Sequence, residues 1–257
     1  MHPGCTAIAC VIGHEGPDSS LIDDAIIYAV DRGARVLSLA FAIAPDPSIE
    51  AAIEYAAAAG VFMPAPAGNL VVPDLDVLFP ASHEKVMAVG ATNGHDDPWA
   101  FTVPGPEVEI SAPGIDLVTI GPSPLFDYEF VGGTSYSMVQ VAGAAALLMS
   151  WADCLDGDDV RRILRESAVD VNMPGWDAAT GFGRLDVGRA LEQVIAESIP
   201  GCRCVEDLDG DGHVTGRDLG RLLTGWGGSD AALDLDGSGD VGIDDLAVWL
   251  DWNGTCR

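Results

Sequence analysis

The residues best placed for chemistry lie in the stretch GGTSYSMVQVAGAAALL, residues 132–148. Ser135 follows two glycines and a threonine, and a run of small and apolar residues begins directly after it. Glycines let the backbone crowd close to a substrate, and the small-residue run predicts a helix whose N-terminus adds positive potential beside the serine. A serine so placed can attack a carbonyl carbon once a base takes its proton. A Gly-Thr-Ser sequence before a helix is also a common helix cap, so this stretch alone leaves both interpretations open.

A second chemical pattern occurs twice near the C-terminus. Residues 207–218 read DLDGDGHVTGRD and residues 234–245 read DLDGSGDVGIDD, with a period of 27 residues. Each loop has oxygen-bearing side chains at positions 1, 3 and 5, glycine at position 6 and Asp at position 12. This spacing wraps one hard cation, and apolar residues after each loop indicate a short helix. The sequence therefore predicts two calcium sites.

The elements that must position these residues alternate along the chain. Strands are predicted at 6–12, 35–42, 61–66, 85–91 and 107–111, and helices at 19–32, 47–60, 135–150, 157–167 and 186–197. Such alternation predicts an α/β fold with a mostly parallel sheet covered on both faces. The Pro-, Gly- and Cys-containing segment 198–204 is predicted to link this domain, residues 1–197, to a small helical module at 205–257.

The composition limits the classes of partner. The chain has 257 residues, with 40 Asp and Glu against 12 Lys and Arg, and a net charge of −28. A surface of that charge repels nucleic acid and anionic membranes, which disfavours both as partners. Two explanations of the acidity stay open: calcium binding in a salty medium, or a compositional bias of the genome. No apolar run reaches the roughly 18 residues that a membrane-spanning helix needs.

Three upstream segments occur in a fixed order before the Ser135 stretch. They are APAGN, which ends at Asn69, PASHEKVMAVGAT at 80–92 and ISAPG at 110–114. With GGTS and VAG they have the order and spacing of subtilisin-like serine proteases (subtilases, peptidase S8), which the chain resembles from about residue 3 to residue 195. The resemblance implies a three-layer α/β/α fold and a serine endopeptidase activity that hydrolyses peptide bonds. It also implies that Ser135 is the nucleophile and that the Asn69 amide donates to the developing oxyanion.

The resemblance further implies where a peptide or protein substrate would bind. The substrate would add as a strand between two segments, formed by Leu39, Ala40 and Phe41 and by Ala65, Pro66 and Ala67. The chain departs from the family in both. Phe41 introduces a bulky ring, and the two prolines Pro64 and Pro66 remove backbone donors from a predicted interior strand.

The catalytic Asp and His of the family are not visible in this sequence. Subtilases place both before the Ser, upstream of the segment that MHPGCTAIACVIG resembles, and none of the five histidines has the family's context. Three interpretations stay open: Met1 is an internal methionine of a longer endopeptidase, the chain is an inactive pseudoprotease or binding module, or it is a truncated product without a stable fold. Activity of this chain is therefore uncertain, and low activity is expected.

The paired loops resemble a dockerin, a twin calcium-loop module with Asp at position 12. The resemblance implies Ca2+ as the cofactor and a cohesin-like or cell-surface partner, although the residues before the closing Asp are not the usual hydroxyl pair. The implied ligands are Asp207, Asp209, Asp211, His213, Thr215 and Asp218 in the first site and Asp234, Asp236, Ser238, Asp240 and Asp245 in the second. His213 and Asp240 would bind through backbone carbonyls, and Gly242 at position 9 predicts a weaker second site.

Cysteine usage and the calcium loops favour an extracellular or cell-surface protein. A disulfide from Cys202 or Cys204 to Cys256 would close the ends of the module, although sequence does not fix the pairing of six cysteines. The apolar start of the chain lacks the basic residues of a signal peptide and is interpreted as a buried strand.

Overall fold

The computed structural model describes residues 6–13, 17–69, 75–120, 128–152, 154–197, 208, 214–230 and 232–250. The chain forms two compact units, one of Met1–Met149 with Asp156–Gln193 and one of Ser150–Leu155 with Val194–Arg257. In the described part of the chain, every helix is too short or too polar to cross a bilayer.

A parallel sheet forms the centre of the first unit. Its strands are β1 (Pro64–Pro66), β2 (Met87–Thr92) and β3 (Val108–Pro113), in the spatial order β1-β2-β3. All six residues of β2 are buried, as expected for a strand covered on both faces. The parallel direction brings the carboxyl ends of the strands to one edge of the sheet.

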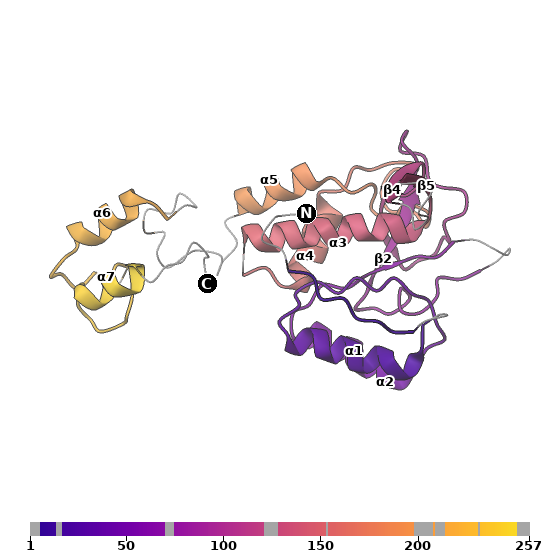
Figure 1. Ribbon diagram of the computed structural model, residues 1–257. Coiled ribbons are helices and arrows are strands. Elements are labelled where there is room, and N and C mark those ends of the chain that lie inside the picture. The colour runs from indigo at the N-terminus through magenta and orange to yellow at the C-terminus, as the bar shows by residue number, and fades with distance from the viewer. Residues whose placement is uncertain are drawn as a thin grey trace. The chain divides into compact units, whose positions relative to one another are not determined.

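Helices cover both faces of this sheet (Figure 1). On one side α1 (Ser19–Asp31) and α2 (Pro47–Ala58) pack against each other, and on the other lie α3 (Thr134–Trp151), α4 (Gly157–Glu166) and α5 (Val187–Glu197). The predicted α/β architecture with a mostly parallel sheet is confirmed. All five predicted helices are present, and their ends lie within two residues of the prediction.

Local capping explains why the helix boundaries were predictable. Asp18 accepts a hydrogen bond from the Ser20 N–H at 3.0 Å and starts α1. Asp46 accepts from the Ser48 N–H at 2.9 Å and starts α2, with a proline at the first helical position. Each carboxylate satisfies a backbone donor that the first turn of a helix leaves unpaired, so these boundaries are set within a few residues of sequence.

The segment 35–42, predicted as a strand, is not a continuous strand. Leu37 donates to the Phe62 carbonyl at 2.9 Å and Leu39 donates to the Pro64 carbonyl at 3.1 Å, so the segment runs parallel to the chain leading into β1. After Phe62, the β1 chain donates no backbone hydrogen bond back to the segment 35–42. The predicted strand at 61–66 is correspondingly shortened to β1.

Two prolines account for this difference. In a parallel ladder, alternate residues of a strand bond to the same neighbour. Pro64 and Pro66 both face the segment 35–42, and neither has an N–H to donate to it. Ala67 faces β2 and donates to the Val89 carbonyl at 2.9 Å, so the ladder on that side is intact.

The prediction of a buried strand at 6–12 is wrong for the residues that the structure describes. Residues 6–13 have no regular secondary structure, and residues 6–11 are exposed. No ladder pairs them with another described strand. An apolar run suits a strand, but a strand forms only where a neighbour supplies backbone donors and acceptors.

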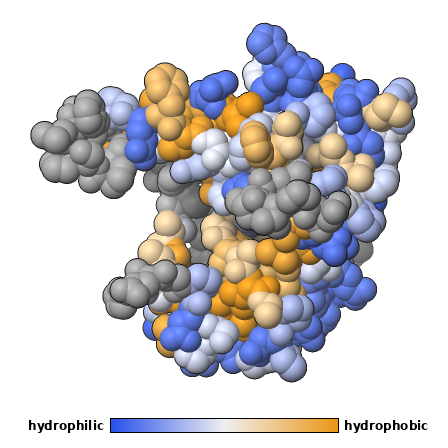
Figure 2. Space-filling view, turned by 90° about the vertical axis from the view of Figure 1, so that its right-hand side faces the viewer, coloured by the Kyte–Doolittle hydropathy of each residue, from blue (hydrophilic) through white to orange (hydrophobic). Residues whose placement is uncertain are grey.

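The sequence also failed to predict a hairpin directly before the Ser135 stretch. Strands β4 (Leu117–Ile120) and β5 (Tyr128–Val131) pair antiparallel, with Val118 opposite Phe130 and Ile120 opposite Tyr128. All four side chains are exposed. Apolar patches among hydrophilic side chains are also visible on the face of the molecule in Figure 2.

The second unit contains two short helices, α6 (Gly216–Thr224) and α7 (Ile243–Leu250). Each follows one of the two acidic loops, as predicted. Leu222, Leu233 and Val241 form a small buried core between them. Cys154 of this unit is disulfide-bonded, whereas Cys10 of the first unit is a free thiol. The pairing predicted for Cys202 or Cys204 with Cys256 lies outside the described residues.

Candidate functional site

Ser135 is the second residue of α3 and is half-buried. The turn before it is tied to the end of β3, because the Gly133 N–H donates to the Gly114 carbonyl at 2.7 Å. Gly114 has no room for a side chain: a Cβ there would lie 2.3 Å from Ser137 Oγ and 2.6 Å from Ala91 Cβ. The close approach of this turn to α3 therefore requires glycine.

Asn69 lies against the same turn from a different part of the sheet. Its Oδ1 accepts hydrogen bonds from the Thr134 N–H and the Thr134 hydroxyl, both at 3.0 Å. Since a backbone N–H only donates, the atom that faces it must be the carbonyl oxygen of the amide. The Nδ2 group of Asn69 is consequently the end left to donate elsewhere, on an exposed side chain.

Thr134 joins the two segments and is fully buried. Its hydroxyl also accepts from the Gly68 N–H at 3.3 Å, so it bonds to the residue before Asn69 as well. Gly133, with φ of 152°, brings the backbone so close that a Cβ there would lie 3.3 Å from Asn69 Nδ2. The Asn69 amide and the N-terminal turn of α3 are thus held together beside Ser135, where an oxyanion would find positive potential.

Sequence reasoning did not assign a role to Thr134. The signal was present in GGTS, since a hydroxyl directly before the candidate nucleophile is a possible hydrogen-bond partner. Only the folded chain shows that this hydroxyl bonds to a residue 65 positions away.

The two predicted substrate segments lie next to each other. Leu39, Ala65 and Ala67 are buried, Phe41 and Pro66 are half-buried, and Ala40 is exposed. Leu39 is the last residue of the first segment that bonds to the β1 chain, and Phe41 then donates to the Leu39 carbonyl at 3.0 Å. The segment therefore curls away from β1 around Ala40. The role of these residues in substrate binding stays a prediction.

Neither histidine in the described residues hydrogen-bonds to Ser135. His83 lies near the start of β2, with Nε2 at 3.7 Å from Glu54 Oε1 and Nδ1 accepting from the Lys85 N–H. His95 lies in the loop after β2, where its N–H donates to Asn93 Oδ1. The described residues therefore bring the candidate nucleophile Ser135 and the candidate oxyanion donor Asn69 together, and neither described histidine is bonded to Ser135.

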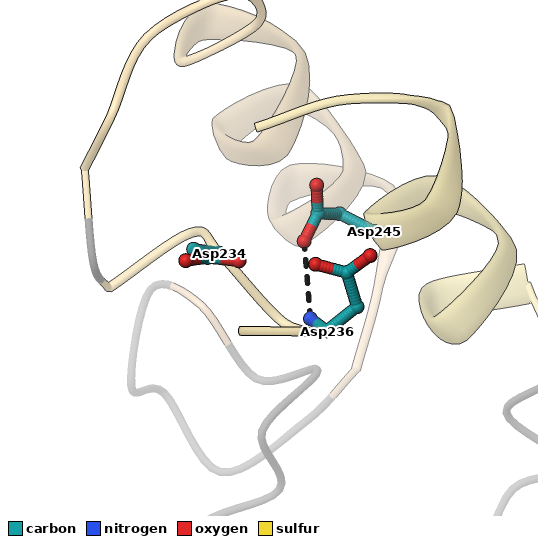
Figure 3. A group of neighbouring side chains, drawn as sticks. All are labelled: Asp234, Asp236 and Asp245. Atoms are coloured by element: carbon teal, nitrogen blue, oxygen red, sulfur yellow. Dashed lines mark hydrogen bonds between the residues drawn. The ribbon is translucent and has the colours of Figure 1, made fainter. Parts of the chain in front are cut away.

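The second acidic loop brings three carboxylates together. One oxygen each of Asp234, Asp236 and Asp245 lies within 4.8 Å of the others, and Figure 3 shows the Asp236 and Asp245 carboxylates next to each other. Asp245 is buried, and its oxygens accept from the N–H groups of Leu235 and Gly242, each at 2.6 Å. These backbone hydrogen bonds, led by that of Gly242, hold the pKa of Asp245 below its usual value. The carboxylate is thus ionised and aimed into the loop.

The remaining predicted ligands of this loop are less constrained. Ser238 and Asp240 are exposed, and the Ser238 hydroxyl donates to the Asp240 carbonyl at 3.1 Å. Three carboxylates, a hydroxyl and a backbone carbonyl form an oxygen-only donor set, which fits a hard cation such as Ca2+. Gly239 supplies the turn, with φ of 99°.

The first acidic loop is described only at Leu208 and from residue 214 onward. Asp207, Asp209, Asp211 and His213 lie outside the described residues. At the end of the loop, the Thr215 N–H donates to Asp218 Oδ2 at 2.6 Å, which repeats the bond from Gly242 N–H to Asp245 Oδ2. Positions 9 and 12 of the two loops thus share one geometry.

The chain is similar to known proteins over most of its length. The sequence model of the Subtilase family (peptidase S8) matches residues 3–183. The chain is 35% identical to the thermophilic serine proteinase of Bacillus sp. (strain AK1) over 172 residues, 66% of this chain and 41% of the relative. It is 28% identical to the halolysin-like extracellular serine protease Nep of Natrialba magadii over 88% of this chain and 42% of the relative. It thus spans about two fifths of the length of these relatives.

A solved structure shows the same fold. The prenylagaramide maturation protease PagA superimposes with a TM-score of 0.61 and 26% identity over 71% of this chain and 70% of that one. Residues 3–183, which match the family model, include Asn69, the turn at Gly114 and Ser135, and the structure brings these three together. The chain belongs to the subtilase family of serine proteases.

Proposed function

We propose that the first unit carries a subtilisin-like endopeptidase site in which Ser135 is the nucleophile and Asn69 the oxyanion donor. The observation that carries the proposal is the pair of hydrogen bonds from Thr134 to Asn69 Oδ1, because they direct the amide N–H groups away from Thr134. Family membership supplies the reaction class, and a peptide or protein is the substrate.

In the proposed reaction, Ser135 Oγ attacks the carbonyl carbon of a peptide and passes its proton to a base. The carbonyl electron pair moves onto oxygen, which becomes negatively charged. The Asn69 amide and the N-terminal turn of α3 stabilise that oxygen because they are fixed before the reaction begins. Loss of the corresponding asparagine in subtilisin, a relative of this chain, lowers kcat by about 10²–10³-fold.

No histidine among the described residues is placed to act as the base. The described histidines contact Glu54, Lys85 and Asn93 rather than Ser135, so turnover by this chain alone should be low. In subtilisin, loss of the histidine lowers kcat by about 10⁶-fold. This favours a second candidate function, a pseudoprotease or binding module that keeps the subtilase fold.

Peptide turnover by the purified chain and by its Ser135→Ala and Asn69→Ala variants separates the two functions. An endopeptidase site requires that any turnover is lost in Ser135→Ala and falls in Asn69→Ala. Turnover near that of subtilisin, lost in Ser135→Ala, would reject the pseudoprotease. Turnover that persists in Ser135→Ala would reject Ser135 as the nucleophile.

For the second unit we propose two calcium sites and a docking role. Asp234, Asp236 and Asp245 with Ser238 and the Asp240 carbonyl would hold one ion, which would neutralise the loop and fix the start of α7. The six predicted ligands that end at Asp218 would hold the other. Exposed Ile243, Leu250 and Leu223 on the two helices favour a cohesin-like or cell-surface partner. Calorimetric titration of the chain with a purified cohesin, with calcium and with chelator, tests this role.

We also propose that the protein acts outside the cell. Extracellular calcium is abundant enough for loops of modest affinity, and one relative is named as extracellular. Detection of the protein in the culture medium of its source, rather than in the cell lysate, tests the proposal.

A further inference from the structure

A cavity of about 510 Å³ lies at the start of β2 and β3. Val86 precedes β2, Glu107 precedes β3, and both line the cavity. Ser135 lies beyond the opposite ends of these strands. Since a strand rises about 3.3 Å per residue, the six residues of β2 separate the two places by about 20 Å. The cavity is therefore distinct from the proposed peptidase site.

One wall of the cavity is a closed ion pair. Arg161 Nε donates to Glu109 Oε2 at 2.8 Å, and Arg161 Nη2 donates to Glu109 Oε1, so the guanidinium occupies both carboxylate oxygens. The third nitrogen, Nη1, donates to the Glu84 carbonyl at 2.6 Å. Glu109 is 11% exposed at its side chain, and Arg161 neutralises it. This pair needs no further partner.

Arg165 lies beside that pair, one turn further along α4. Its Nη1 is 3.6 Å from Glu109 Oε2, which is beyond hydrogen-bond distance, and it donates to no acceptor among the described residues. Its guanidinium lies over the Phe182 ring at 4.3 Å, which fixes its plane. With 40% of the side chain exposed, Arg165 presents unused donors at the cavity.

The other charged groups that line the cavity are Glu84, Glu107 and His83. The Glu84 side chain is 79% exposed, 3.8 Å from Lys85 Nζ. His83 is turned to Glu54 and the Lys85 N–H, as described above. Glu107 is the one lining carboxylate with no ion pair among the described residues, and it opposes the binding of an anion. The rest of the lining is largely apolar, with Trp176 43% exposed and its indole N–H bonded to the Val108 carbonyl.

From these contacts we infer that the cavity binds a small carboxylate whose apolar part contacts Trp176. Arg165 holds the carboxylate through its guanidinium fork, a geometry that carboxylates match with two parallel hydrogen bonds. Trp176 and the apolar lining take the rest of the molecule. The carboxylate belongs to a free acid or to the C-terminus of a peptide, since both present the same chemistry.

Calorimetric titration of the full chain at about 150 mM ionic strength tests the inference, with phenylacetate as the probe. The neutral phenylacetamide and the cationic 2-phenylethylamine have the same ring and should bind at least about tenfold more weakly. Arg165→Gln should weaken phenylacetate binding by about tenfold or more, because a charge-assisted bidentate contact is lost. Glu107→Gln should strengthen it, because an opposing charge is removed.

Two matched variants serve as controls. Arg162→Gln removes the same charge from the same helix, where Arg162 pairs with Glu166 at 3.0 Å, and should leave the Kd for phenylacetate unchanged. Ser135→Ala should also leave it unchanged, which separates this site from the proposed peptidase.

The inference is overturned if 2-phenylethylamine binds as well as phenylacetate, if Arg165→Gln leaves the Kd unchanged in a protein that melts normally, or if phenylacetate does not bind. A peptide that ends in glycyl-phenylalanine distinguishes the two sources. Binding at least as tight as that of phenylacetate supports a peptide terminus, and exclusion of the peptide with retained phenylacetate binding supports a free acid.

Discussion

The turn before Ser135 and the acidic loop at Asp234 are built from opposite kinds of contact. In the turn, Asn69 Oδ1 is held by Thr134, 65 residues further along the chain, and Gly133 is held by Gly114. In the loop, Asp245 accepts from the N–H groups of Leu235 and Gly242, and both hydrogen bonds join residues no more than 10 positions apart. The first arrangement exists only after the sheet has formed, whereas the hydrogen bonds of the second join residues of one short sequence motif.

This difference predicts which kind of change disrupts each site. The turn is uncharged and closely packed, so steric change should break it while ions and pH have little effect. The loop gathers like charges that repel one another, so we expect its fold to depend on a bound cation and on the ionised carboxylate of Asp245. The small core of Leu222, Leu233 and Val241 buries too little apolar surface to hold this unit folded if the cation or the ionised carboxylate is lost.

Calcium removal should therefore unfold the second unit and leave the first intact. We expect amide hydrogen exchange in chelator to reach the rate of an unfolded chain in α6 and α7, with protection in β2 and α3 unchanged. The measurement is exchange followed by mass spectrometry on the full chain, with and without calcium. Equal protection of α7 in both conditions would contradict a calcium-controlled fold.

Acid should weaken the same unit. Because backbone hydrogen bonds lower the pKa of Asp245 in the folded state, its ionised form stabilises the fold above the ordinary pKa of about 3.9, and that stability is lost as the pH falls through the lower folded value. Asp245→Asn should reduce the dependence of the stability of the second unit on pH below about 5. Circular dichroism melts in saturating calcium, where the second unit is expected to be folded, measure it between pH 3 and 7, and identical slopes in the two proteins would refute the assignment.

Gly114→Ala should break the first unit and spare the second. The added methyl would overlap Ser137 Oγ and Ala91 Cβ, and overpacking of this kind costs about 1–3 kcal/mol. Gly143→Ala on α3 is the matched control, since nothing lies within 4 Å of its added Cβ. Denaturant unfolding of the two variants should show a lower midpoint for Gly114→Ala alone. A midpoint for Gly114→Ala equal to that of the unsubstituted protein would contradict the close packing of this turn.

Thr134→Val should give a smaller effect at the same place. It keeps the shape of the side chain but leaves the Gly68 N–H without its acceptor and Asn69 Oδ1 with one donor, at a cost of about 1–2 kcal/mol. Thr134→Ser keeps the hydroxyl and should restore most of the stability. The side-chain amide resonances of Asn69 in NMR spectra should shift in Thr134→Val and remain in place in Thr134→Ser. Unchanged resonances in Thr134→Val would show that Thr134 does not orient the amide.

Much of the fold could be predicted because its signals are local. Asp18 and Asp46 cap their helices through residues two positions away, so the starts of α1 and α2 follow from the sequence. The strands 6–12 and 35–42 could not be predicted in the same way, since a strand depends on the donors of its neighbour. Pro64 and Pro66 remove those donors for the segment 35–42. Which side of β1 the two prolines face follows only from the register of β1 against β2.

The sequence by itself determined the subtilase family, the α/β alternation, Ser135 and Asn69 as candidates, and the spacing of the acidic loops. These are properties of residue type and short-range order. Tertiary structure alone decided that Thr134 orients the Asn69 amide, that the described histidines contact other residues than Ser135, and that Arg165 stands beside a closed Arg161–Glu109 pair. Each of these depends on which side chains meet after long loops have closed, and residue types do not encode distances between remote segments.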